Sequence, residues 1–189
     1  MKPTIKFSLA AGLIFCSSFA LFLLTLCRTA FPFGSADEVA VHLGLSPFAP
    51  SANPIWGFLV RLVARLPGDA VLNIHRFSAL LGASTLVILF FVIVRLSHDR
   101  TREERSSTGD DSTARLISGM FGCAYLAVSI PFWMVSTRAF PISLGELIFL
   151  VCVLLGLSAF YTKRKWLIFP TCLLWGKSCN HSQRCSPSK

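Results

Sequence analysis

An unbroken stretch without charge near the N-terminus is the feature that most constrains this chain. Residues Phe7 to Cys27 contain no acidic or basic side chain. A helix rises about 1.5 Å per residue, so roughly 20 apolar residues cross the hydrocarbon core of a bilayer. Two further windows, Phe77 to Val94 and Leu116 to Thr137, are also uncharged, and Ser143 to Thr162 contains only Glu146. These four windows predict four membrane-spanning helices.

The composition agrees with a membrane protein. The chain is 53% hydrophobic with a mean hydropathy of +0.64, which exceeds what one soluble core of 189 residues needs. We therefore predict an all-α, multi-pass integral membrane protein. Its membrane domain covers residues 1–176, with helices at about 7–27, 77–96, 116–137 and 143–162, a partial helix at 166–175 and an outer loop at 28–76. Residues 177–189 are predicted to form a disordered tail, and 97–114 a flexible linker.

The first window also has features of an export signal, because Lys2 and Lys6 precede it. A cleaved signal has an apolar region of about 7 to 15 residues that ends in small residues, whereas this one is longer and ends in Leu26 and Cys27. A lipoprotein signal would need a small residue where Leu26 stands. We expect an uncleaved first helix.

The basic residues predict the orientation of the chain in the membrane. Lys2 and Lys6 precede the first helix, five arginines lie within 95–115, and three basic residues follow the fourth window at 163–165. Because Lys and Arg collect on the cytoplasmic side, the N-terminus is expected on the cytoplasmic side of the membrane and the 28–76 loop on the far side. The net charge of +9 is then located at membrane edges, and the mixed charges of 95–111 exclude a nucleic-acid partner.

The outer loop contains the pattern of an amphipathic helix at 53–66. Asn53 is suited to cap its first turn, Pro54 fits the first helical position, and Pro67-Gly68 ends it. Its apolar residues recur at helical spacing, with Arg61 and Arg65 on another face. Such a helix is expected to lie on the membrane, with membrane lipids as partners. The apolar residues are Ile55, Phe58, Leu59, Leu62, Val63 and Leu66.

Two adjacent acids, Asp37 and Glu38, open a shorter helix expected at Ala36 to Leu45. Negative charge in the first turn of a helix is stabilised by the helix dipole, so these acids need no further role. The alternative is a functional site on the outer face of the membrane.

The sequence resembles membrane glycosyltransferases of the GT-C type, and more closely a bacterial membrane family related to protein O-mannosyltransferases. The stretches "SADEVAVHLGLSPFAPSANPIWGFLVRLVARLPG", "NIHRFSALLGASTLVILFFVIVRL" and "SIPFWMVSTRAFP" carry the likeness, which covers roughly residues 5–162. The family's Asn-x-x-Ser-Ala-Leu entry to its second helix is approximated here by Asn73, Phe77, Ser78, Ala79 and Leu80.

The resemblance implies a location in a bacterial inner (plasma) membrane, a polyprenyl-phosphate-linked sugar donor and transfer on the outer face. It places the catalytic acid at Asp37, with Glu38 beside it. A carboxylate there would take the proton of the acceptor or hold a divalent metal against the leaving phosphate. Arg138 is expected to bind the donor phosphate; its alternative role is that of an anchor at a helix end.

Two further residues support this site in the same interpretation. Glu146 lies inside the fourth window, where an ionisable group is a functional candidate, although reaching the interface or pairing with Arg138 also accounts for it. His42 follows Glu38 by one helical turn and is otherwise a structural residue. No specific cofactor follows from the sequence, and a divalent metal at the acids stays open. Cys179, His181 and Cys185 do not have the spacing of a zinc site.

The length of the chain leaves two hypotheses for its function. Enzymes of this type have many more helices, so the first hypothesis is an N-terminal fragment of a GT-C-type glycosyltransferase that is inactive alone. The second is a small, non-catalytic accessory membrane protein that binds lipid surfaces through the 53–66 helix.

Overall fold

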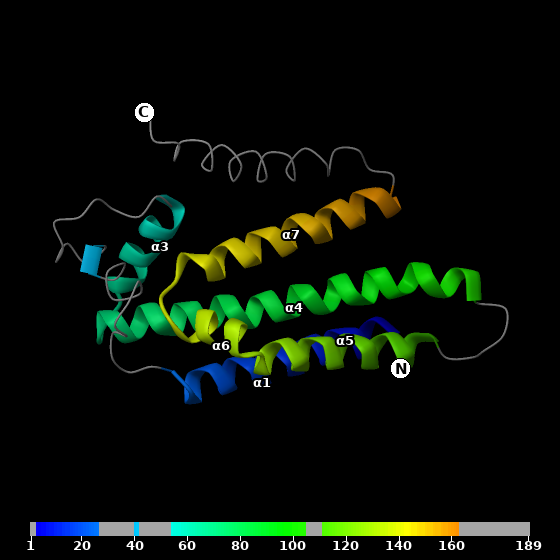
Figure 1. The fold of residues 1–189 in the computed structure, drawn as a ribbon, viewed down its shortest axis with the longest axis horizontal. Coiled ribbons are helices and arrows are strands. Elements are labelled where there is room, and N and C mark those ends of the chain that lie inside the picture. Colours follow the sequence, from blue (N-terminus) through cyan, green and yellow to red (C-terminus); the bar gives the residue numbers. More distant parts are fainter. Residues whose placement is uncertain (1–2, 27–39, 42–53, 105–110, 163–189) are drawn as a thin grey trace, which may run out of the picture.

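The computed structural model describes residues 3–26, 40–41, 54–104 and 111–162, all of which belong to helices or to the turns that join them. Residues 40 and 41 are helical and lie within the short helix expected at 36–45. The longer helices, labelled in Figure 1, are α1 (Pro3–Leu24), α3 (Pro54–Ala64), α4 (Ala70–Glu104), α5 (Asp111–Val128), α6 (Ile130–Thr137) and α7 (Pro141–Thr162).

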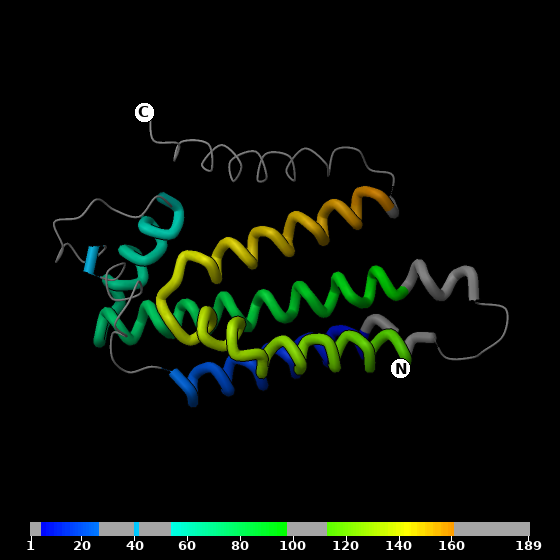
Figure 2. The backbone as a smooth tube through the Cα atoms, in the orientation of Figure 1, coloured from blue at the N-terminus to red at the C-terminus, as the bar shows by residue number. Residues whose placement is uncertain are grey.

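Helix α4 is the centre of the bundle. It contacts α1, α3, α5, α6 and α7, and the tube in Figure 2 shows the long helices running alongside it. Helices α1 and α5 run against α4 and α7 runs with it, so three segments meet at one end of the bundle (Figure 1). These are α3, the start of α4 and the α6–α7 turn at 138–140, and we call their location the α3 end.

Three helices are long and apolar enough to cross a membrane: Ile5–Leu24, Ala70–Ser97 and Pro141–Phe160. A fourth crossing results if Thr113–Val128 and Ile130–Thr137 together form one bent span. The prediction of an all-α, multi-pass membrane protein is confirmed. The amphipathic helix of the outer loop is present as α3 and begins at Pro54, as expected.

Helix α4 is longer than the helix expected at 77–96. It begins at Ala70, where the Asp69 carboxylate accepts a hydrogen bond of 2.9 Å from the backbone N–H of Val71 and so caps the first turn. At its other end it continues to Glu104, into the segment expected as a flexible linker. Arg and Glu are good helix formers, so their charge does not end a helix that leaves the membrane.

The segment expected as one helix at 116–137 is two helices that meet at an angle of 70°. Ser129 separates them, with extended backbone at φ −67° and ψ 130°. Its hydroxyl donates to the Leu126 carbonyl at 2.8 Å. Pro131 is the physical reason for the break, because proline lacks the N–H that a continuous helix would use and its ring collides with the carbonyl four residues earlier.

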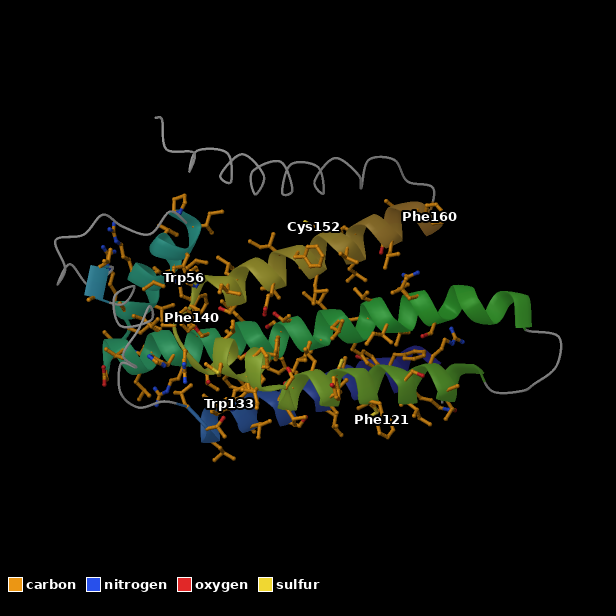
Figure 3. All side chains as sticks on the ribbon, in the orientation of Figure 1. Trp56, Phe121, Trp133, Phe140, Cys152 and Phe160 are labelled. Atoms are coloured by element: carbon orange, nitrogen blue, oxygen red, sulfur yellow. The ribbon has the colours of Figure 1, made fainter. Side chains whose placement is uncertain are left out.

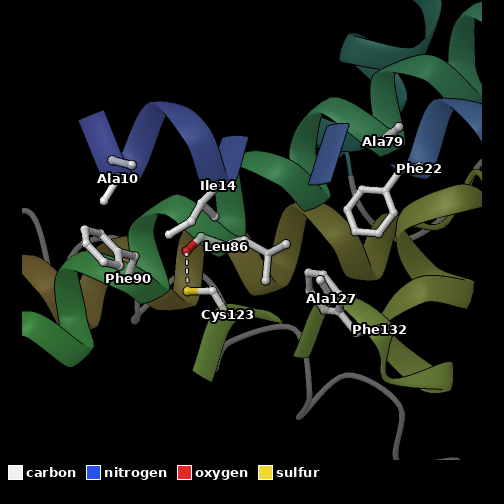
Figure 4. Close-up of a cluster of buried hydrophobic side chains, with 10 residues drawn as sticks. Ala10, Ile14, Phe22, Ala79, Leu86, Phe90, Cys123, Ala127 and Phe132 are labelled. Carbon is white, nitrogen blue, oxygen red and sulfur yellow. Dashed lines mark hydrogen bonds between the residues drawn. The ribbon is translucent and has the colours of Figure 1, made fainter. Parts of the chain in front are cut away.

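The main core joins α1, α4, α5 and α6 (Figure 4). Phe22 of α1 packs against Phe132 of α6 with ring centroids 6.1 Å apart. The Cys123 thiol of α5 contacts the Leu86 carbonyl of α4 at 3.3 Å, drawn as a dashed line in Figure 4. Small side chains alternate with these large ones and let the helices approach closely, which is how helices associate in lipid.

Glycines mark the closest approaches to α4. A Cβ added to Gly119 would lie 2.7 Å from the Phe90 ring, and one added to Gly122 would lie 2.8 Å from Ile93 Cδ1. A Cβ added to Gly82 would collide with the Ser136 hydroxyl and would lie 2.6 Å from Ser136 Cβ. Because Ser136 has a short side chain, that collision can be relieved only by moving α6.

We therefore predict that Gly82→Ala destabilises the protein by about 1 to 3 kcal/mol through overpacking. Gly145→Ala is the matched control, because a Cβ there meets nothing within 4 Å. Thermal unfolding of the purified chain in detergent measures both. An unchanged melting temperature for Gly82→Ala would show that α6 does not pack on α4 as described.

Candidate functional site

The α3 end is held together by a second apolar cluster, built from α3, α4, α7 and the α6–α7 turn. Trp56 is its largest member, is 0% exposed and lies 6.1 Å from the Phe77 ring, centroid to centroid. Figure 3 labels Trp56 and shows it at this end of the bundle. The sequence pattern did not identify this face of α3. The cluster comprises Trp56, Val60, Ile74, Leu81, Ala139 and Leu144.

A tight turn joins α3 to α4. Gly68 has φ 113°, a backbone conformation that glycine adopts without strain. Next to it, the Asn73 side-chain amide donates to the Leu66 carbonyl at 3.3 Å. Helix α3 ends at Ala64, two residues before the end predicted from Pro67-Gly68, and the chain turns over 65–68. Asn73 of the family-like entry motif ties this turn to α4.

Two long-range hydrogen bonds hold helix α6. His75 Nδ1 of α4 lies 3.1 Å from the carbonyl oxygen of Thr137, the last residue of α6. The final carbonyls of a helix have no partner within that helix, so the imidazole satisfies one of them. In the middle of α6, Trp133 Nε1 donates to Thr25 Oγ1 at 2.8 Å, just beyond the end of α1. We call the contact between His75 and Thr137 the latch.

The latch fixes the tautomer of His75. A carbonyl oxygen only accepts hydrogen bonds, so Nδ1 carries the proton and donates it. In the neutral ring Nε2 is then an unprotonated acceptor. His75 is 0% exposed. Sequence reasoning missed this residue because its partner lies 62 residues away, and the only local signal was a histidine beside Asn73 at the entry of an apolar helix.

Arg138 follows the latch directly. It forms the C-cap of α6 with extended backbone at φ −123° and ψ 157°, and its side chain is half-buried. Both Arg138 and Asp69 are close enough to His75 to act on the ring electrostatically. The structure thus puts Arg138, the residue predicted to bind phosphate, at the α3 end of the bundle.

Of the other predicted site residues, the structure describes only Glu146. Glu146 is half-buried in the second turn of α7. Asp37, Glu38 and His42 lie outside the described residues. Within the described ranges there is no group of three His, Cys, Asp or Glu side chains that could hold a metal ion. The tail at 177–189, with Cys179, His181 and Cys185, also lies outside them.

Comparison with known families decides the relationship. Residues 39–179 match the model described as "Protein O-mannosyl-transferase TMEM260 N-terminal domain". The match covers well over half of the chain. The chain belongs to this family. No curated protein and no solved structure matches it significantly.

The matched segment divides the predicted site residues. His42, Arg138 and Glu146 lie inside it, as do His75 and Thr137 of the latch. Asp37 and Glu38 immediately precede it. The match includes α3, α4, α5, α6 and α7 in full, whereas α1 lies before it.

Loss of the latch should destabilise the bundle. We expect His75→Leu to cost about 1 to 3 kcal/mol, because the Thr137 carbonyl loses its buried donor. His75→Asn should cost less, since its amide nitrogen can take the position of Nδ1. Chemical or thermal unfolding in detergent compares the two, and equal losses would contradict the donor role of Nδ1.

Proposed function

We propose that this chain is the N-terminal part of a GT-C-type glycosyltransferase that uses a polyprenyl-phosphate-linked sugar, and that it is inactive on its own. It resides in a bacterial inner membrane with its N-terminus in the cytoplasm, so that the α3 end faces outward. Membership of the O-mannosyltransferase family supports the reaction class, and the matched family model is itself that of an N-terminal domain.

The single observation that carries the proposal is the position of Arg138. It lies at the α3 end, beside the junction of α3, α4 and α7, and the latch fixes the residue before it. A guanidinium binds phosphate oxygens in a planar, two-pronged geometry. A lipid-borne phosphate reaches a protein at the membrane surface, which is where a residue at the end of a bent span is located.

The outer-loop acids supply the remaining chemistry in this proposal. Asp37 takes the proton from the acceptor hydroxyl while the oxygen attacks the sugar carbon, and the bond from that carbon to the phosphate oxygen breaks. The leaving polyprenyl phosphate keeps the electron pair, and Arg138 stabilises its charge. Glu38 lies beside Asp37, and His42 and Glu146 are assigned supporting roles. A divalent metal held by the acids would assist the same departure.

Donor binding tests the role of Arg138. We expect Arg138→Gln to weaken binding of a fluorescent polyprenyl-phosphate mannose to the purified chain in nanodiscs by about tenfold or more, the loss typical of a charged hydrogen bond. Arg95→Gln is the control, because Arg95 is exposed near the opposite end of α4. Equal affinity for Arg138→Gln and the parent chain would overturn the assignment.

The same preparation tests the proposed inactivity. Incubated with labelled donor and acceptor peptides, the chain should transfer no mannose above a protein-free control. Measured transfer would refute inactivity, and the variant Asp37→Asn would then show whether Asp37 carries it, with a loss of about 100-fold or more expected of a catalytic base.

A second candidate function is supported by the outer face of α3. One side of α3 is buried in the apolar cluster, while Phe58 is 69% and Leu62 55% exposed. Arg61 and Arg65 are exposed beside them. An exposed apolar stripe bordered by arginines fits a lipid surface, with the apolar side chains in the interface and the guanidinium groups on lipid phosphates. The chain would then serve as a non-catalytic accessory protein that binds membrane lipids.

Lipid contact of α3 can be measured directly. A fluorophore on Phe58→Cys, in a background without the native cysteines, should be quenched by brominated lipids, whereas one on Asp69→Cys in the α3–α4 turn should be quenched less. Replacing Arg61 and Arg65 by Ser should reduce the anionic lipid that co-purifies with the chain, relative to Arg95→Ser. If neither quenching nor lipid retention changes, α3 is not a lipid-binding surface.

A further inference from the structure

Three buried polar atoms at the α4–α6 contact have no hydrogen-bond partner among the described residues. They are His75 Nε2, Ser78 Oγ and Ser136 Oγ. His75 and Ser78 are 0% exposed and Ser136 is 1% exposed. Burying such groups without a partner costs about 1 to 3 kcal/mol each, so three of them in one place require an explanation.

The three atoms come from one strip of the interface. His75, Ser78 and Gly82 are spaced by three and four residues, which puts them on the same face of α4. Gly82 faces Ser136, because a Cβ at position 82 would collide with the Ser136 hydroxyl. The latch brings the Thr137 backbone against His75 in the same place.

Other hydroxyls in these helices are satisfied differently. Ser84, Thr85 and Thr137 each donate at 2.8 Å to the carbonyl four residues earlier. Ser78 and Ser136 do not make this local bond. The Ser136 hydroxyl lies against α4 at Gly82, and Ser78 is one helical turn before Gly82 on the same face.

The chemistry of the three atoms defines what fits between them. Because Nδ1 donates to Thr137, Nε2 has a lone pair and needs a donor. The serine hydroxyls both donate and accept. A phosphate or carboxylate oxygen cannot donate to Nε2, and an apolar group satisfies none of them. The smallest molecule that donates and accepts is water, and buried waters typically make about three such bonds.

We propose that His75, Ser78 and Ser136 bind one buried water molecule between α4 and α6. The water donates to Nε2 and to one serine oxygen and accepts from the other hydroxyl. It joins the two helices beside the latch, and so holds the end of α6 from which Arg138 emerges. This site is independent of the proposed glycosyl transfer, because it requires neither donor nor acceptor.

Solid-state NMR of the full chain in bilayers tests the site directly. With ¹⁵N-labelled histidine, the Nε2 signal that disappears in His75→Asn belongs to His75. We expect this nitrogen to be unprotonated and to receive magnetisation from water protons. A protonated Nε2, or an Nε2 that receives no transfer from water, would overturn the proposal.

Serine variants give a second, independent readout. If a water joins the hydroxyls, Ser78→Ala and Ser136→Ala should each lower the melting temperature by about 2 to 4 °C, and the double variant should lose less than the sum, because both act through one water. Ser84→Ala is the control, since that hydroxyl bonds to its own helix. Unchanged or raised melting temperatures for both serine variants would contradict a bridging water, because deleting an unsatisfied buried hydroxyl is neutral or stabilising.

Discussion

The hydrogen bond from His75 to the carbonyl of Thr137 is the interaction on which the rest of the arrangement depends. A helix that breaks inside a membrane leaves carbonyls without partners, and lipid offers none. The break at Ser129 turns α6 by 70° away from α5, and α4 supplies the donor that the end of α6 lacks. That hydrogen bond and the apolar cluster around Ala139 together fix the turn that carries Arg138 and starts α7.

Much of the fold was predictable because the bilayer imposes a length. The uncharged windows predicted the spans, and Pro54 predicted the start of α3, which ends at Ala64, a little before Pro67-Gly68. The bend at Ser129 was missed although Pro131 signals it, because the surrounding residues are apolar enough to read as one continuous span. The latch could not be predicted, since no local pattern links residues 62 positions apart. The burial of Trp56 was missed because α3 is apolar on two faces. Only the packing shows which of these faces contacts α4 and α7.

The sequence indicated which residues could form the candidate site, but not how they are arranged in space. Arg138 stood out as a lone cation between apolar windows, and the structure places it at the α3 end. The family match, over residues 39–179, includes this residue. The acidic pair Asp37-Glu38 precedes the match and lies outside the described residues, so its role rests on the resemblance and on the chemistry of glycosyl transfer.

The most direct test of this account is a dipolar-coupling measurement by solid-state NMR between His75 Nδ1 and the Thr137 carbonyl carbon, on the full chain in bilayers. Because Nδ1 lies 3.1 Å from the carbonyl oxygen, the account predicts a strong coupling that is absent in His75→Leu. If the parent chain shows no such coupling between Nδ1 and the Thr137 carbonyl carbon, the account is contradicted.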